Sequence, residues 1–197
     1  MSDTKTLLFF DTETSGVDAE RNGILQIAWI IERNGEVFDE CVSDVALPKD
    51  LSISLEALEI NNFTLERMKK GRDACAVMEQ LRLKLKSAVG GGPAAIPCGH
   101  NIKFDIDFLH RTAKRINAAW WCNFGQNDYL ALRSPVCTLA LCHYCAYRGI
   151  LELPNYKLAT LCGHFGIPLT PHDALADIRA TRSLFYKLDS LLIQGGM

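Results

Sequence analysis

Two carboxylates follow an apolar run near the start of the chain. The run Leu7–Phe10 is followed by Asp11 and Glu13 and then by a Ser-Gly break. Residues two apart in an extended strand project from the same face, so the two carboxylates should stand side by side. Like charges at that spacing repel, and a hard divalent cation with oxygen ligands removes the repulsion. The pattern favours a metal site over the alternative, a solvated acidic strand end.

Two further aspartates interrupt the apolar faces of predicted helices. On the helix predicted from Ile102 to about Asn117, a rotation of about 100° per residue places Asp105 at the edge of the apolar face and Asp107 on the solvent side. On the helix predicted from Ala174 to Leu192, Asp177 falls near the middle of the apolar stripe. A carboxylate among apolar groups is costly unless it is neutralised, paired or bound to a metal.

These carboxylates and one nearby histidine suit a particular chemistry. Two Mg²⁺ or Mn²⁺ ions held by four carboxylates can clamp the attacking and leaving oxygens of an in-line phosphoryl displacement. The candidate ligands are Asp11, Glu13, Asp105 and Asp177. A loop histidine alone is usually a surface residue, but His172 lies five residues before Asp177. Histidine is suited to deprotonating the attacking water near neutral pH, so we expect His172 to be the general base.

Composition limits the fold and the mode of binding. The chain has 197 residues, of which 48% are apolar, and a net charge of −2. We expect one domain spanning residues 1–197. Without a broad basic surface, any contact with nucleic acid should be local, at an active-site cleft. The polar N-terminus lacks a signal-peptide pattern and no apolar run is long enough to span a bilayer, which predicts a cytoplasmic protein with no membrane partner.

Eight cysteines in such a compartment indicate reduced thiols. Cys142 and Cys145 have a metal-like spacing, with Cys137, Cys162 and His164 nearby in sequence. No second CxxC pair accompanies them, and their neighbours are apolar, so ordinary core cysteines are favoured over a structural zinc site or a zinc-held interaction surface.

The order of elements predicts a mixed α/β chain that begins with a hairpin. Ile24–Ile31 and Glu36–Val42 are predicted strands, and Asn34-Gly35 between them is a strong hairpin signal. Residues 118–135 show no clear period, and their aromatics could stack on bases or, as favoured here, pack on the body. Further helices are predicted at 55–60, 73–89, 138–147 and 157–165, with a short strand at 94–98.

Three segments resemble the motifs of a nuclease family. FDTETSG at Phe10–Gly16, GHNIKFD at Gly99–Asp105 and HDALAD at His172–Asp177 are similar to the three motifs of the DEDDh (DnaQ-like) exonucleases. That family includes the proofreading subunit of DNA polymerase III, ribonuclease T and oligoribonuclease. The resemblance implies a ribonuclease H-like fold, a mixed five-stranded sheet flanked by helices. It also implies 3′→5′ hydrolysis of DNA or RNA that releases nucleoside 5′-monophosphates.

The resemblance also implies roles for individual residues. By position, the metal ligands are Asp11, Glu13, Asp105 and Asp177, and the base is His172. Thr14 and Asn101 should lie near the terminal nucleotide. The partners would be nucleic-acid 3′ ends, most simply single-stranded, and a homodimer is left open. A non-catalytic nucleic-acid or polymerase-binding module on the same fold is the alternative. One departure from the family is Cys137, which stands where relatives often carry an aspartate.

Overall fold

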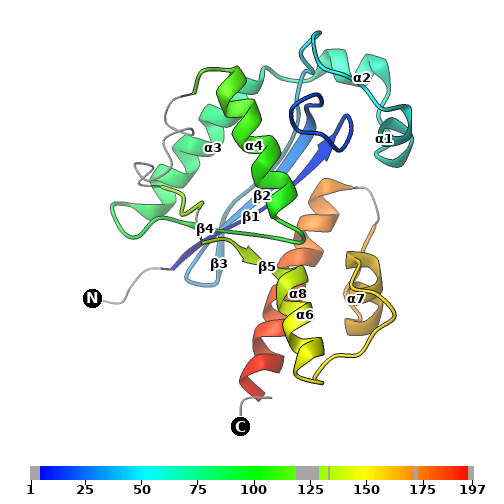
Figure 1. Ribbon diagram of the computed structural model, residues 1–197. Helices are drawn as coiled ribbons and strands as arrows, with labels where there is room; N and C mark the ends of the chain where they lie inside the picture. The colour runs from blue at the N-terminus through cyan, green and yellow to red at the C-terminus, as the bar shows by residue number, and fades with distance from the viewer. Residues whose placement is uncertain (1–4, 119–128, 133, 171–172, 195–197) are drawn as a thin grey trace.

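The protein is built around one mixed sheet of five strands (Figure 1). The computed structural model describes residues 5–118, 129–132, 134–170 and 173–194. The strand order is β3-β2-β1-β4-β5, with the first three strands antiparallel and β4 and β5 parallel to β1. The sheet confirms the predicted ribonuclease H-like architecture. The strands are β1 Thr6–Thr14, β2 Ile24–Arg33, β3 Glu36–Asp44, β4 Ile96–Gly99 and β5 Val136–Cys137.

The hairpin between β2 and β3 forms where the sequence predicted it. Asn34 and Gly35 both have positive φ, 53° and 87°. Two such residues form the turn whose twist matches that of paired antiparallel strands. The turn therefore fixes the register of β2 against β3 at Arg33 opposite Glu36.

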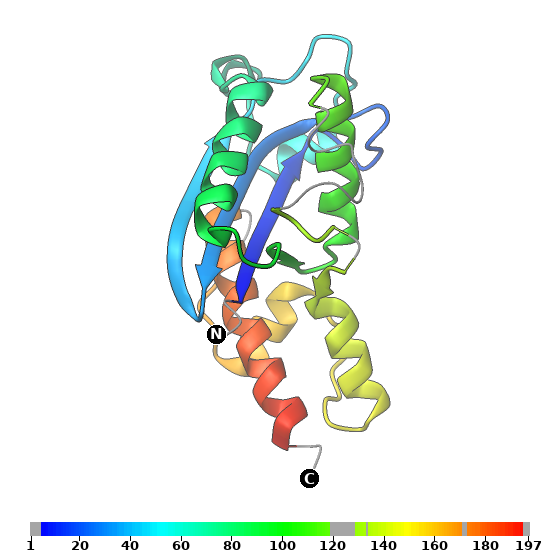
Figure 2. The same ribbon diagram turned by 90° about the vertical axis from the view of Figure 1, so that its left-hand side faces the viewer.

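The helices form a layer on each face of the sheet. Figure 2 shows α3 and α4 beside the strands, with α6, α7 and α8 gathered at the other end of the molecule. The side chains of Leu8 and Phe10 pack in the cluster that includes α3 and α4, whereas Phe9 packs with α8. Strand β1 is thus buried on both faces. The helices are α1 Leu55–Ile60, α2 Leu65–Lys70, α3 Ala74–Val89, α4 Lys103–Arg115, α6 Thr138–Tyr147, α7 Leu158–Phe165 and α8 Ala174–Gln194.

Two short elements were not anticipated from the sequence. Helix α2 has six residues with only Met68 buried, and its N-cap is Thr64. Strand β5 has two residues and pairs with the end of β4. Both are too short to show a hydrophobic period.

The cysteines and the aromatic loop fall partly within the described structure. Cys142 and Cys145 are buried in an apolar cluster with leucines of α8, and no group of three or more candidate ligand atoms among the described residues includes a cysteine. Their surroundings favour core cysteines over a zinc site.

Residues 119–128 lie outside the described part, but Leu130 at the end of that loop is buried against Ala95. None of the described helices has the length and apolarity to cross a membrane.

A buried ion pair joins α8 to the sheet. Glu32 of β2 is only 2% exposed, and the Nε of Arg182 donates to its carboxylate at 2.6 Å. Tyr186, one turn further along α8, donates its hydroxyl to the same carboxylate. Arg182 also donates to the carbonyl of Gly35 at 3.1 Å, so one side chain ties α8 to β2 and to the hairpin turn.

Replacing Arg182 with alanine should destabilise the fold, because it leaves the Glu32 carboxylate buried without its cation. We expect a loss of about 2–4 kcal/mol in the free energy of unfolding, measured by urea denaturation. The double variant Arg182→Ala/Glu32→Gln should lose less than the single variant. Arg179→Ala is the control, since Arg179 is largely exposed where it pairs with Glu40 and should cost less than about 1 kcal/mol. Equal losses at both arginines would contradict this role.

Candidate metal centre

Three of the predicted carboxylates meet at the end of β1. Each of Asp11, Glu13 and Asp177 offers a carboxylate oxygen, and the three oxygens lie within 4.8 Å of one another. Side chains alternate along a strand, so Asp11 and Glu13 lie on the same face as Phe9, the face covered by α8. Asp177 lies in the first turn of α8 and meets them there. Residues 166 positions apart in the chain are thus brought to one place.

The start of α8 is fixed by its own capping residue. The Oδ1 of Asp173 accepts the backbone N–H groups of Leu175 at 3.0 Å and Ala176 at 2.9 Å, as expected of an N-cap. Ala174 is fully buried among residues of β1, β2 and β4, which lets the helix approach the sheet closely. A negative side chain in the first turn is also favoured by the helix dipole, which suits Asp177.

Asp105 reaches the site from the opposite face of β1. It is 3% exposed, and its Oδ1 accepts the Thr12 N–H at 2.9 Å and the Thr12 hydroxyl at 2.7 Å. Asp107, two residues later, is exposed and pairs with Lys103. The expected contrast between the two aspartates is confirmed. Asp105 is not among the three residues whose ligand atoms cluster within 4.8 Å, but its charge acts on Asp11 across the strand.

Crowding changes the proton affinity of these acids. Burial, followed by the charges of Asp105, Glu13 and Asp177, holds the pKa of Asp11 well above its usual value. Burial also raises the pKa of Asp105 to about 7, against the opposing effect of the Thr12 hydrogen bonds. An all-oxygen donor set with this excess of negative charge fits a hard divalent cation such as Mg²⁺ or Mn²⁺.

The remaining predicted residues have different surroundings. The Thr14 hydroxyl is buried and donates to the Gly16 carbonyl at 2.6 Å. The Thr14 carbonyl accepts the Asn61 amide at 3.1 Å, which anchors α1 beside the site. Asn101 is exposed with a positive φ of 61° and lines a cavity of about 570 Å³. His172 lies outside the described residues.

Sequence reasoning missed two groups that support the site. One is Thr12, which lies between the two carboxylates of β1 and faces the other side of the strand. The other is Arg67 of α2, a cation near Glu13 that no local sequence pattern reveals. Its guanidinium contacts both Asp44 oxygens, at 2.7 and 2.8 Å, and the charge of Glu13 also acts on it. Asp44 in turn accepts the amide of Gln26, which stands opposite Glu13 in the sheet.

The metal-free protein should lose stability through Asp105 as pH rises. The pKa of Asp105 is higher in the folded than in the unfolded state. The contribution of this residue to the free energy of unfolding therefore falls between about pH 4 and pH 7. Asp105→Asn keeps the oxygen that accepts from Thr12 but removes the charge. In EDTA the variant should gain several degrees in Tm relative to wild type between pH 5 and pH 8, at roughly 2–4 °C per kcal/mol.

The same measurement with Mn²⁺ completes the test. Because the metal competes with protons, Mn²⁺ should raise the wild-type Tm more at pH 8 than at pH 5, and should raise that of Asp105→Asn less. Asp107→Asn, with its exposed carboxylate, serves as control and should behave as wild type. A Tm difference between wild type and Asp105→Asn that does not change with pH would contradict the assignment.

The sequence matches a known protein family and several known proteins. A family model described as Exonuclease (RNase_T) matches residues 8–185. DNA polymerase III PolC-type from Oceanobacillus iheyensis is 28% identical over 191 residues, 96% of this chain and 12% of the relative. The PolC-type polymerase from Thermotoga maritima is 25% identical over 193 residues, 98% of this chain and 12% of the relative. This chain therefore spans about an eighth of the length of these relatives.

Solved structures show the same fold. E. coli exonuclease I in complex with a dT13 oligonucleotide matches with a TM-score of 0.80 and 22% identity, covering 96% of this chain and 42% of that one. Exonuclease I from Methylocaldum szegediense matches with a TM-score of 0.72 and 20% identity, covering 96% and 40%. The family model spans nearly the whole sequence, and the chain belongs to the DnaQ-like exonuclease family.

Proposed function

We propose that this chain is a DEDDh-type, metal-dependent 3′→5′ exonuclease that releases nucleoside 5′-monophosphates from nucleic-acid 3′ ends. The observation that carries the proposal is the meeting of Asp11, Glu13 and Asp177 within 4.8 Å. These residues come from two of the three sequence motifs, and Asp105 of the remaining motif is tied to the strand between them. A fold maintained for another purpose would not need this costly cluster of acids.

The carboxylates would hold two divalent ions. Asp11, Glu13 and Asp177 would be the direct ligands, and Asp105 would complete the set. When bound, the two ions stabilise the charge that develops on the attacking and leaving oxygens of the phosphodiester. The chain itself fixes the geometry, since α8 packs on β1 and Thr12 holds the Asp105 carboxylate in place.

His172 is the proposed general base. The support comes from sequence, because His172 lies five residues before Asp177 in the motif that resembles the DEDDh branch. A histidine at that position can take the proton of the attacking water near neutral pH. A tyrosine there would indicate the other branch of the family.

Single-stranded DNA is the proposed substrate, and the similarity to the relatives supports it. They are DNA polymerases, and a solved neighbour holds a dT13 oligonucleotide. Single-stranded RNA is the second candidate. The net charge of −2 favours contacts limited to a few nucleotides at the 3′ end. The proposed ligands all lie in one chain, so the site needs no residue from a second copy. We place this activity in a single domain spanning residues 1–197 and, as the sequence predicts, in the cytoplasm.

A non-catalytic binding module on the same fold is the competing function. It would bind nucleic acid or a polymerase without cleaving the strand, and fold alone does not exclude it. The two functions differ in what they require of Asp11. A module tolerates its loss, whereas the enzyme does not.

The direct test uses oligonucleotides labelled at the 3′ or the 5′ end, as single-stranded DNA, duplex DNA and RNA, with Mg²⁺ or Mn²⁺. We expect the 3′ label to be released first, as a mononucleotide. Asp11→Ala should lower the rate at least 10³-fold, because an ion ligand supports several kcal/mol of transition-state stabilisation. Asp107→Ala should keep wild-type activity. Binding without cleavage by the wild type would favour the module, and full activity in excess EDTA would contradict the metal mechanism.

The role of His172 predicts a separation between chemistry and metal binding. His172→Ala should lower kcat by about 10²–10⁴-fold, the usual contribution of a general base. The Kd for Mn²⁺, measured by isothermal titration, should change less than about threefold, since the base is not a ligand. His164→Ala, at the end of α7, is the control. Parallel losses of kcat and of Mn²⁺ affinity would instead make His172 a ligand.

A further inference from the structure

A row of polar side chains crosses the sheet from the metal centre to its edge. Glu13 of β1 stands directly opposite Gln26 of β2, and Gln26 stands directly opposite Asp44 of the edge strand β3. Residues opposite one another on paired strands project from the same face, with Cβ atoms about 4.5–5.5 Å apart. We call Glu13, Gln26 and Asp44 the cross-strand row. In this row two carboxylates flank one amide.

Helix α2 holds the far end of the cross-strand row. The Arg67 guanidinium donates to both oxygens of Asp44, at 2.7 and 2.8 Å, and its Cζ lies 3.8 Å from the centroid of the Phe63 ring. Burial acts to raise the pKa of Asp44, but the hydrogen bonds from Arg67 and Gln26 outweigh it and lower that pKa. Asp44 is therefore an ionised acceptor that is fixed in place.

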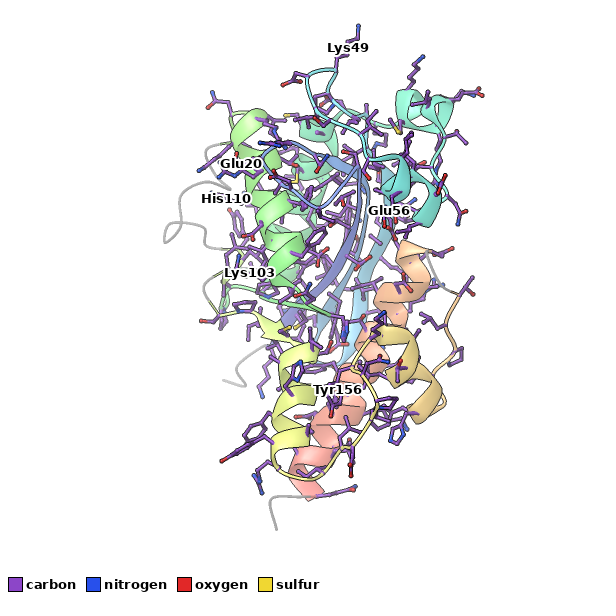
Figure 3. The ribbon with its side chains drawn as sticks, turned by 45° about the vertical axis from the view of Figure 1, so that its right-hand side comes forward. Glu20, Lys49, Glu56, Lys103, His110 and Tyr156 are labelled. Atoms are coloured by element: carbon purple, nitrogen blue, oxygen red, sulfur yellow. The ribbon has the colours of Figure 1, made fainter. Side chains whose placement is uncertain are left out.

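A β-bulge fixes the middle of the row. Strand β2 has one extra residue, Leu25, just beyond the pair of Glu13 and Gln26. Leu25 is fully buried in an apolar cluster that includes residues of α1 and α2. Figure 3 shows α1, which carries Glu56, at this end of the sheet. Bulges next to functional sites redirect side chains, and this one anchors the backbone beside Gln26.

The amide of Gln26 is suited to link the two carboxylates. Its Nε2 donates to Oδ1 of Asp44 at 2.6 Å. An ionised carboxylate only accepts hydrogen bonds, so this contact fixes the nitrogen and not the oxygen of the amide toward Asp44. The nitrogen carries a second N–H, and Glu13 stands on the other side of Gln26 in the row.

We propose that Gln26 is a positioning residue of the metal centre. The second N–H of its amide orients the Glu13 carboxylate toward the divalent ions, while Asp44 and Arg67 hold the amide from behind. The inference rests on the proposed function, since it takes Glu13 to be a metal ligand. Groups that orient metal ligands by hydrogen bonds contribute about 10–100-fold in metal affinity or activity. The row thereby makes metal affinity depend on residues that lie outside the three motifs.

The test measures Mn²⁺ binding by isothermal titration, together with Tm in EDTA, and so does not depend on cleavage. Gln26→Leu removes both N–H groups and leaves the two bonds between Arg67 and Asp44 in place. We expect its Kd for Mn²⁺ to rise about 10–100-fold. Gln80→Leu is the matched control, because this glutamine of α3 accepts from Arg72 and its loss should leave the Kd at the wild-type value. A merely structural role of Gln26 would lower the Tm in EDTA and leave the Kd unchanged.

A second variant separates position from charge. Arg67→Met combined with Asp44→Asn removes the ion pair but keeps the net charge of the wild type. We expect a smaller rise in the Kd for Mn²⁺, because the amide loses its support. In the Gln26→Leu background the same pair of changes should add no further rise, since Asp44 and Arg67 act on Glu13 through Gln26. Effects that multiply would contradict this linkage.

An unchanged Kd for Mn²⁺ in Gln26→Leu would overturn the role of Gln26. If Gln26→Leu does not fold, the variant at Arg67 and Asp44 decides, because both side chains are partly exposed and tolerate substitution; a wild-type Kd there overturns the proposal. If the wild type binds no Mn²⁺, the metal centre and this role fail together. Mn²⁺ binding by the wild type without cleavage of a labelled oligonucleotide overturns the exonuclease function alone, and the Kd values still decide the role of Gln26.

Discussion

Repulsion among carboxylates is the constraint on which this structure depends. Asp11, Glu13 and Asp177 bring their oxygens within 4.8 Å, and Asp105 adds its charge through the strand. Such an arrangement works against folding unless the surrounding structure holds it together. The sheet does so with strand β1, which is buried on both faces by α3 and α4 on one side and α8 on the other. The stability of the apolar layers offsets the unfavourable charge at the end of β1.

The alternation of side chains along β1 explains how distant segments serve one site. Asp11 and Glu13 face α8 and meet Asp177, whereas Thr12 faces α4 and holds Asp105. One strand thus links an acid of α4 with an acid of α8. Near Glu13, the ion pair of Arg67 with Asp44 links α2 to β3. Further along β2, the ion pair of Glu32 with Arg182 joins α8 to the sheet. These ion pairs hold α2 and α8 against the sheet that carries Asp11 and Glu13.

Local patterns allowed much of this to be predicted from sequence. Burial of Asp105 and exposure of Asp107 followed from helix geometry, and the hairpin followed from Asn34-Gly35. The bond between Asp105 and Thr12 spans 93 residues, so no local signal reveals it. The same holds for Arg67, whose partner Asp44 lies on a different element, and for β5, whose two residues are defined by pairing with β4 alone. The cross-strand row of Glu13, Gln26 and Asp44 was also invisible, because its members lie on three strands that are paired only in the fold.

The most direct measurement of the central claim is anomalous diffraction from crystals of the protein soaked in Mn²⁺. The structure predicts anomalous density for Mn²⁺ within about 2.0–2.6 Å of carboxylate oxygens of Asp11, Glu13 and Asp177, on the side of β1 that faces α8. Density confined to other parts of the molecule, with none among these three side chains, would contradict it.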